Sequence, residues 1–450
     1  MEQNVPEVPA ASGESAAPKN ASSPAAPGMR RAAAQASFTA SVREIVAVPL
    51  TYLAAWLYIA VLLPYGGEDP LRLRLRLAVF TLAFVALAEY LHRGAPRARE
   101  SWIWLGCLSA VLLGIVLGRD RVWEDYDVLF LHVFAVWWLL SRSGTLLEGE
   151  SGHLLPLDAL DGFFVFPFRH FLLNLRALSY ALMHPRGEGR SARRTTILWS
   201  LAALVAALAL LVGAAGLLME ADAAFDRLLS SLTDRLHIDW DEGLTARLLL
   251  CLPVGAYLFG LLAGTAREDK AQLRRCAAAV SAGLKKLRQV PAQVWLALTA
   301  LFCALYALFF AVQAQYLFGA FTRTLPAGFV VAEYARRGFF ELCKVMAVNF
   351  ALLWLVTRLA REDVRRSRAL LTLCLLLLGE SVLFAVVALS KLWLYISCFG
   401  FTPRRLQAAW LACTLLFGCL CAAWSLVREQ KTFRLWMVFG AATLAALCLY

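Results

Sequence analysis

Ionisable side chains inside long apolar runs are the residues of this sequence best suited to chemistry. Glu380 lies eleven residues into the run 369–396, near its midpoint, and no Lys or Arg lies three or four residues away along the chain. Burying such a group in an apolar environment is costly, so it is a candidate site by default. We expect Glu380 either to be protonated or to pair across helices, in a structural hydrogen bond or in a proton or substrate site.

A second set of polar side chains is predicted to gather near one end of the same run. Lys391 and Tyr395 are four residues apart and share one helical face, and Glu341 and Lys344 are three apart at the start of another apolar run. Gln315 closes a third run. Threading the chain across a membrane places all of these side chains at one depth. We therefore predict an ion pair between Glu341 and either Lys344 or Lys391.

One weak pattern would suit a metal. Asp239 and Asp241 flank Trp240, and two carboxylates at this spacing can hold Mg²⁺ or Mn²⁺ against a pyrophosphate. A chance pair in an already acidic loop is the simpler explanation of the pattern. The sequence contains no phosphate-binding loop, no nucleophile elbow and no His-Glu-x-x-His zinc motif, so neither an enzyme nor a cofactor is predicted from motifs.

The composition indicates that most of the chain is surrounded by lipid rather than by water. Of 450 residues, 60% are hydrophobic and 17% are charged, whereas an average soluble domain is nearer 45–50% apolar and about 25% charged. The net charge is +12, but the basic residues lie in short loops between apolar runs. They therefore indicate topology and anionic lipid, and no nucleic-acid partner is expected. The eleven cysteines are expected to be reduced, mostly buried, small hydrophobic residues.

Repeated apolar runs of about 20 residues predict membrane-spanning helices, because isolated strands would leave backbone groups unpaired in lipid. The predicted fold is an all-α, polytopic transmembrane helical bundle of about eleven spans. The spans are 45–64, 76–91, 101–118, 127–141, 196–219, 244–266, 292–318, 339–358, 369–396, 406–427 and 433–450. The run 127–141 is the shortest and has His132 inside it.

Lys and Arg residues fix the predicted orientation. The part of the tail near the first span and the loops on its side of the membrane contain 28 of them, and the loops on the other side contain 12. The positive-inside rule then places the N-terminus in the cytoplasm and the C-terminus outside.

Four regions follow from this threading. Residues 1–44 are a Pro/Ala/Ser-rich tail that is expected to be disordered, and 45–141 form a four-span region. A cytoplasmic connector covers 142–195, and 196–450 form a seven-span region. Within the connector, 163–183 is predicted to be an interfacial helix, with a re-entrant segment as the alternative.

The loop 267–290 is predicted to be a basic amphipathic helix. Its apolar residues recur at steps of three and four, and lysines and arginines occupy the rest of its surface. We expect it to lie on the cytoplasmic leaflet and to contact anionic lipid, or alternatively to bind a protein partner that the sequence does not identify.

Four segments together resemble an uncharacterised bacterial family of multi-pass membrane proteins. The central one is EYARRGFFEL, which contains Glu333, Tyr334, Arg336 and Glu341. The others are ADAAF at 221–225, QYLFG at 315–319, and LSKLWLY followed by FGFT and RL between 389 and 406. The family is known only as a domain of unknown function, of the four-one-five-three and four-one-seven-three types. The similarity covers about residues 196–430, and Phe399 replaces the family's usual tyrosine.

The resemblance implies a multi-pass protein of the bacterial inner membrane and supplies no activity, cofactor or catalytic residue. Physically, Gly338 inside the central motif permits a sharp bend or a close helix approach. A structural elbow is one interpretation of the motif, and a gate for an anion or substrate is the other. Arg336 could neutralise acidic groups or bind a lipid phosphate.

The sequence thus predicts a transporter-like protein or a membrane regulatory or scaffold protein. The alternative is a lipid-linked enzyme of the glycosyltransferase type that uses the outer acidic loop with Asp239 and Asp241.

Overall fold

A computed structural model describes residues 38–183, apart from 65–68, 119–121 and 124–125, and residues 242–450, apart from 323–330 and 429. Between these ranges it describes only 211, 214, 218 and 227. Within the helices, the side chains of 242–245, 313–322 and 331–337 lie outside the described part.

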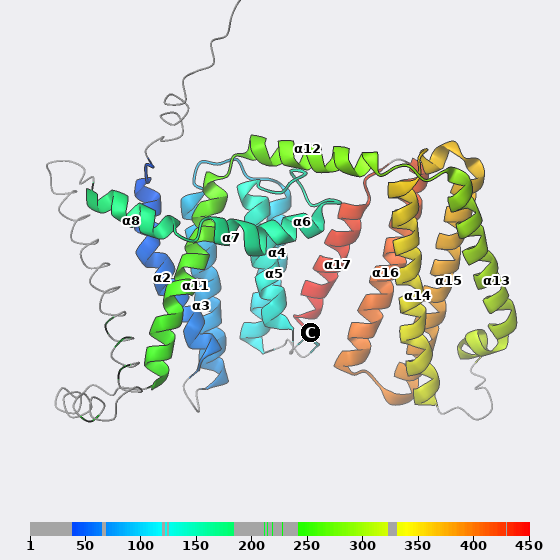
Figure 1. The fold of residues 1–450 in the computed structure, drawn as a ribbon. Helices are drawn as coiled ribbons and strands as arrows, with labels where there is room; N and C mark the ends of the chain where they lie inside the picture. Colours follow the sequence, from blue (N-terminus) through cyan, green and yellow to red (C-terminus); the bar gives the residue numbers. More distant parts are fainter. Residues whose placement is uncertain are drawn as a thin grey trace, which may run out of the picture. The chain divides into compact units, whose positions relative to one another are not determined.

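Every regular element in the described ranges is helical (Figure 1). The first half contains α2 (Val42–Leu62), α3 (Pro70–Leu91), α4 (Glu100–Leu117), α5 (Asp127–Ser143), α6 (Leu155–Leu160), the π-helical turn η1 (Asp161–Val165), α7 (Phe166–Arg169) and α8 (Leu173–Met183). The second half contains α11 (Glu242–Arg267), α12 (Lys270–Lys286), α13 (Ala292–Thr322), α14 (Val331–Leu359), the 3₁₀ turn η2 (Val364–Arg366), α15 (Arg368–Phe399), α16 (Pro403–Arg428) and α17 (Phe433–Leu447).

Local signals set the helix ends. Ser41 and Glu44 form a reciprocal capping box at the start of α2. Asp69 caps α3, and the following Pro70 occupies the first turn, where a missing N–H costs nothing. The helix therefore begins six residues before the predicted span 76–91, and the loop arginines Arg72 and Arg74 lie in its first turns. Gly144, with φ of +71°, ends α5 in the left-handed conformation.

Seven of these helices are long and apolar enough to cross a membrane, so the chain is a membrane protein. They are α2, α4, α11, α13, α14, α15 and α16. The remaining predicted spans in the described part fall on α3, α5 and α17, which are shorter or less apolar. The predicted span 196–219 lies outside the described residues.

The N-terminal bundle consists of α2, α3, α4, α5 and α11, which pack against one another. Ion pairs join its helices at the end that lies near α12 and residues 144–155, here called the connector end. Arg142 at the end of α5 donates through Nε to both carboxylate oxygens of Glu89 on α3, at 3.0 and 3.1 Å. Arg267 of α11 pairs with Glu44 of α2. These pairs stabilise the bundle where solvent or lipid head groups begin.

The segment predicted as one interfacial helix over 163–183 is instead broken into η1, α7 and α8, and Figure 1 shows α7 and α8 lying across α2 and α11. The break lets α7 approach α11 closely. A Cβ on Gly260 would lie 2.5 Å from the Pro167 carbonyl oxygen, and one on Gly264 would lie 2.6 Å from the His170 ring. Gly260 and Gly264 form a Gly-x-x-x-Gly pair, the spacing that permits such contacts in membranes. Phe164 and Phe168 remain exposed.

The C-terminal bundle consists of α13, α14, α15 and α16, around a large buried apolar cluster that includes Met346, Leu377 and Phe384. Helix α17 packs against both α16 and α4. At the end of α17 that is farther from the connector end, a Cβ on Gly114 of α4 would collide with the Cys448 carbonyl. At its near end, Nε of Arg434 lies 3.4 Å from the buried carboxylate of Glu100. Helix α17 therefore links the two bundles through α4.

The amphipathic helix predicted over 267–290 is present as α12. Part of its apolar face is covered by the chain itself, because Leu273, Ala277 and Leu284 pack with connector residues Leu147 and Leu154. The basic side chains are exposed: Arg274, Arg275, Lys285 and Lys286.

Candidate functional site

Glu380 lies in the middle of α15, the longest helix, whose start is capped by the Ser367 side chain. The residue is only 6% exposed, although it carries a carboxyl group within a membrane span. No salt bridge involves it in the described part of the chain, and its Oε2 atom has no hydrogen-bond partner there. A charged carboxylate in that position would lack the pairing that usually accompanies burial.

The neighbours of this carboxyl come from α13. Cys303 and Tyr306 both lie close enough to interact with Glu380 electrostatically. The Cys303 thiol also donates to the Leu373 carbonyl of α15 over 3.7 Å. The spacing of three residues places both α13 side chains on one helix face. The Glu380 carboxyl is therefore enclosed between α15 and α13 by weak donors rather than by a cation.

A chain of hydrogen bonds crosses the bundle at the same level. The Tyr306 hydroxyl of α13 donates to Oδ1 of Asn349 on α14 over 2.7 Å, and Nδ2 of Asn349 donates to the Ser381 hydroxyl of α15 over 2.8 Å. The Ser381 hydroxyl donates to the Leu377 carbonyl. Asn349 is 1% exposed. The network thus joins three helices beside Glu380 in the membrane interior, where amide and hydroxyl side chains hold helices together.

An aromatic cluster closes the bundle on the side of Glu380 away from the connector end. Phe384 lies one helical turn beyond Glu380 and stacks on Phe310 with ring centroids 4.6 Å apart. Tyr306 meets Phe384 edge-on at 5.2 Å, and Phe309 lies 6.1 Å from it. In that direction these rings pack α13 against α15.

Polar atoms continue on the opposite side, toward the connector end. Trp295, Thr299, Cys303 and Tyr306 follow one another at steps of four, four and three along α13, and all are buried. The Thr299 hydroxyl and the Trp295 indole N–H have no hydrogen-bond partner among the described residues. Buried polar atoms of this kind are commonly satisfied by ordered water. The buried face of α13 therefore offers polar groups from the connector end up to Glu380.

The second predicted polar group lies farther along α15. Lys391 is fully buried, eleven residues beyond Glu380 and hence about 16 Å away along the helix, so the two do not pair. Glu341 of α14 is near enough for its charge to act on Lys391. A Cβ on Gly338 would lie 2.6 Å from the Lys391 Nζ atom. Helix α14 runs through Gly338 without a break, so the glycine permits close approach and does not form an elbow.

The other predicted residues are only partly brought together. Lys344 is exposed and does not join Lys391 in the interior. Tyr395 lies under the Arg405 guanidinium, 4.1 Å from the ring centroid, in a cation–π contact. Gln315, Glu333, Tyr334 and Arg336 belong to α13 and α14, but their side chains lie outside the described part.

The weak metal candidates Asp239 and Asp241 also lie outside the described residues. Within the ranges that are described, no group of three His, Cys, Asp or Glu side chains is arranged to hold a metal ion.

Sequence reasoning missed Tyr306, Asn349 and Thr299. Each lies in an apolar run and reads as an ordinary interior residue on its own. The usable signal is that Asn349 is an amide inside a predicted span, a residue type that marks helix–helix contacts in membranes.

Comparison with known proteins adds a family but no activity. A model of the family described as Domain of unknown function (DUF4153) matches residues 103–450, which extends the similarity well beyond the 196–430 expected from motifs. No curated protein and no solved structure matches the chain. Because the match covers far more than half of the sequence, the chain belongs to the DUF4153 family.

Proposed function

We propose that this protein is a proton-linked transporter of the bacterial inner membrane, with Glu380 as the group that binds and releases the proton. The observation that carries the proposal is the buried carboxyl of Glu380, which has no cation beside it in the described part of a membrane-spanning bundle. Carboxyl groups in membrane spans are rare and mark ion and proton pathways. A purely structural role would be expected to provide Oε2 with a partner.

The surroundings of Glu380 support access from one side. The polar face of α13, with Trp295 and Thr299, leads toward the connector end, whereas Phe310 and Phe384 stack on the other side. The positive-inside count places the connector end in the cytoplasm. This arrangement corresponds to a state in which the carboxyl exchanges protons with the cytoplasm and the aromatic cluster closes the opposite route. The proposal includes eleven spans and a cytoplasmic N-terminus.

The test uses the full chain in proteoliposomes that contain a pH-sensitive dye. Mixed small solutes are added outside, and proton movement is followed for the wild type, Glu380→Gln and Glu362→Gln. Glu362 is an exposed acidic residue in the loop before α15 and serves as the matched control. We expect solute-dependent proton movement in the wild type and the control and none in Glu380→Gln. Equal movement with Glu380→Gln would refute the assignment.

Anionic lipid is proposed as the partner of the exposed basic face of α12. Arg274, Arg275, Lys285 and Lys286 point away from the apolar contacts that fix this helix to the connector. Replacing these four residues with glutamine should reduce the amount of anionic phospholipid that remains bound in native mass spectrometry, and unchanged retention would contradict this partner.

A further inference from the structure

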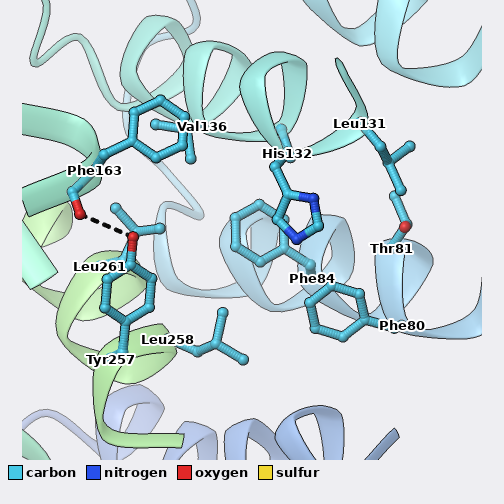
Figure 2. A pocket seen from close by; sticks show the side chains of 11 residues that line it. Phe80, Thr81, Phe84, Leu131, His132, Val136, Phe163, Tyr257, Leu258 and Leu261 are labelled. Atoms are coloured by element: carbon cyan, nitrogen blue, oxygen red, sulfur yellow. Dashed lines mark hydrogen bonds between the residues drawn. The ribbon is translucent and has the colours of Figure 1, made fainter. Parts of the chain in front are cut away.

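The N-terminal bundle contains a cavity of about 100 Å³ that is open on one side. Figure 2 shows the rings of Phe84 and His132 on one side of it and Tyr257 and Leu258 on the other. Tyr257 lies at the middle of the candidate span Ala246–Arg267 of α11, so the cavity lies at the depth of the lipid hydrocarbon.

Most of the lining is apolar, and its polar side chains are already paired. Nδ1 of His132 lies 2.6 Å from the Val128 carbonyl oxygen, to which only an N–H can donate. Nε2 of the neutral ring therefore accepts from the Tyr58 hydroxyl, 2.8 Å away. Both ring nitrogens are thus occupied within the protein, and His132 presents only its ring to the cavity.

The two remaining polar side chains of the lining are also paired within the protein. The Tyr257 hydroxyl donates to the Phe163 carbonyl over 2.9 Å, as the dashed line in Figure 2 shows, and the Thr81 hydroxyl donates to the Leu77 carbonyl over 2.8 Å. A water molecule needs two or more polar partners, and a polar ligand would lose its own hydration without compensation. The chemistry of the lining therefore selects an occupant that is entirely hydrocarbon.

The wall formed by η1 fixes the shape of the cavity. Gly162 lies on α5 so closely that a Cβ would be 2.7 Å from a Val136 methyl group, and this contact holds Phe163 at the cavity. A π-helical turn such as η1 is frequently found at functional sites. We propose that this cavity is a binding site for the end of a hydrocarbon chain of a membrane lipid, either a phospholipid acyl chain or a polyprenyl chain.

The test places the purified full chain in nanodiscs with a lipid whose hydrocarbon chain carries a diazirine. One arm uses such a phospholipid and the other a polyprenyl phosphate, and the adducts are mapped by mass spectrometry after illumination. We expect adducts on the cavity residues of α3, α5 and α11 in at least one arm, and that arm identifies the source of the chain. Adducts on exposed Leu301 and Leu305 of α13 report general lipid contact.

Filling the cavity provides the specific comparison. Ala135 lines it, so Ala135→Phe should reduce the cavity adducts several-fold and leave those on α13 unchanged. Ala86→Phe on the exposed surface of α3 is the matched control and should change neither. Cavity adducts that persist in Ala135→Phe would overturn the proposal. If that variant does not fold, the wild-type map still decides, because adducts on α13 without any on the cavity lining would also overturn it.

Discussion

The polar groups around the N-terminal cavity and those around Glu380 differ in how they are paired. In the N-terminal bundle, the polar side chains around the cavity and the charges at the connector end are paired within the protein, as Tyr58–His132 and Glu89–Arg142 illustrate. In the C-terminal bundle, Glu380 Oε2 and the Thr299 hydroxyl have no partner in the described part. A cavity lining whose polar side chains are all paired is suited to apolar ligands, whereas unpaired buried polar atoms are suited to water and protons. This difference is the reason why we propose the proton site in the C-terminal bundle.

The largest effect on stability is expected in the N-terminal half. The buried Glu100 carboxylate accepts from the Trp104 indole N–H over 2.7 Å and from the Ser151 backbone N–H over 3.1 Å, and it pairs with Arg434 of α17. Glu100→Ala leaves these donors buried without a partner and should cost about 4 kcal/mol in thermal or denaturant unfolding. Glu362→Ala, at an exposed position, should cost almost nothing. A small effect of Glu100→Ala would show that α17 does not depend on this carboxylate.

The next largest effect is a dependence of folding stability on pH, which comes from Asp158 in α6. Burial raises the pKa of Asp158 to about 7, and the like charges of Asp161 and Glu148 add to the shift. The folded state therefore holds this proton more tightly than the unfolded state does. The contribution of Asp158 to stability should therefore be greatest below about pH 4 and fall by roughly 3 kcal/mol as the pH rises to about 7.

Asp158→Asn isolates this contribution, because an amide oxygen can still accept from the Leu147 N–H, 2.8 Å away, and does not titrate. The difference in melting temperature between variant and wild type should grow in favour of the variant from about pH 4 to about pH 7. A difference that is constant over this range would rule out titration of Asp158.

A smaller loss of stability is expected from disturbing the contact between α7 and α11. Gly260→Ala forces its Cβ against the backbone carbonyl of Pro167 and should cost about 2 kcal/mol through overpacking. Gly106→Ala, on α4 with open space around it, is the matched control and should be neutral or slightly stabilising. Equal melting temperatures for the two variants would mean that α7 is not held closely by α11.

The smallest predicted effect lies in the C-terminal bundle. Asn349→Leu removes the bridge between Tyr306 and Ser381 and should cost only about 1 kcal/mol, because hydrogen bonds between membrane helices are individually weak. Proton movement in proteoliposomes should fall much more than stability does. A loss of stability without loss of proton movement would make the network purely structural.

The sequence predicted the helices and the position of Glu380 inside a span, because both depend on local properties, namely apolar run length and a charge inside a run. It could not predict partners, because these depend on how each helix is rotated and which helix lies beside it. Glu89 of α3, for example, pairs with Arg142 of α5. Gly338 was compatible with a sharp bend or with a close helix approach, and the sequence could not decide between them because its neighbour Lys391 lies on another helix.

The family match likewise extends further along the chain than the short motifs do. Motifs covered 196–430, whereas the family model begins at residue 103. The predicted side chains Gln315, Glu333, Tyr334 and Arg336 and the acidic pair Asp239 and Asp241 lie outside the described residues and remain predictions from the sequence.

The central claim is that Glu380 holds an exchangeable proton inside the bundle. Apolar carbodiimides react with protonated carboxyl groups in membrane spans, so the purified protein is treated near neutral pH and the adducts are located by mass spectrometry. We predict modification of Glu380 in the folded wild type, with the exposed Glu362 unmodified. If Glu380 is unmodified in the folded protein but its peptide is readily detected and modified after denaturation at acidic pH, the claim is wrong.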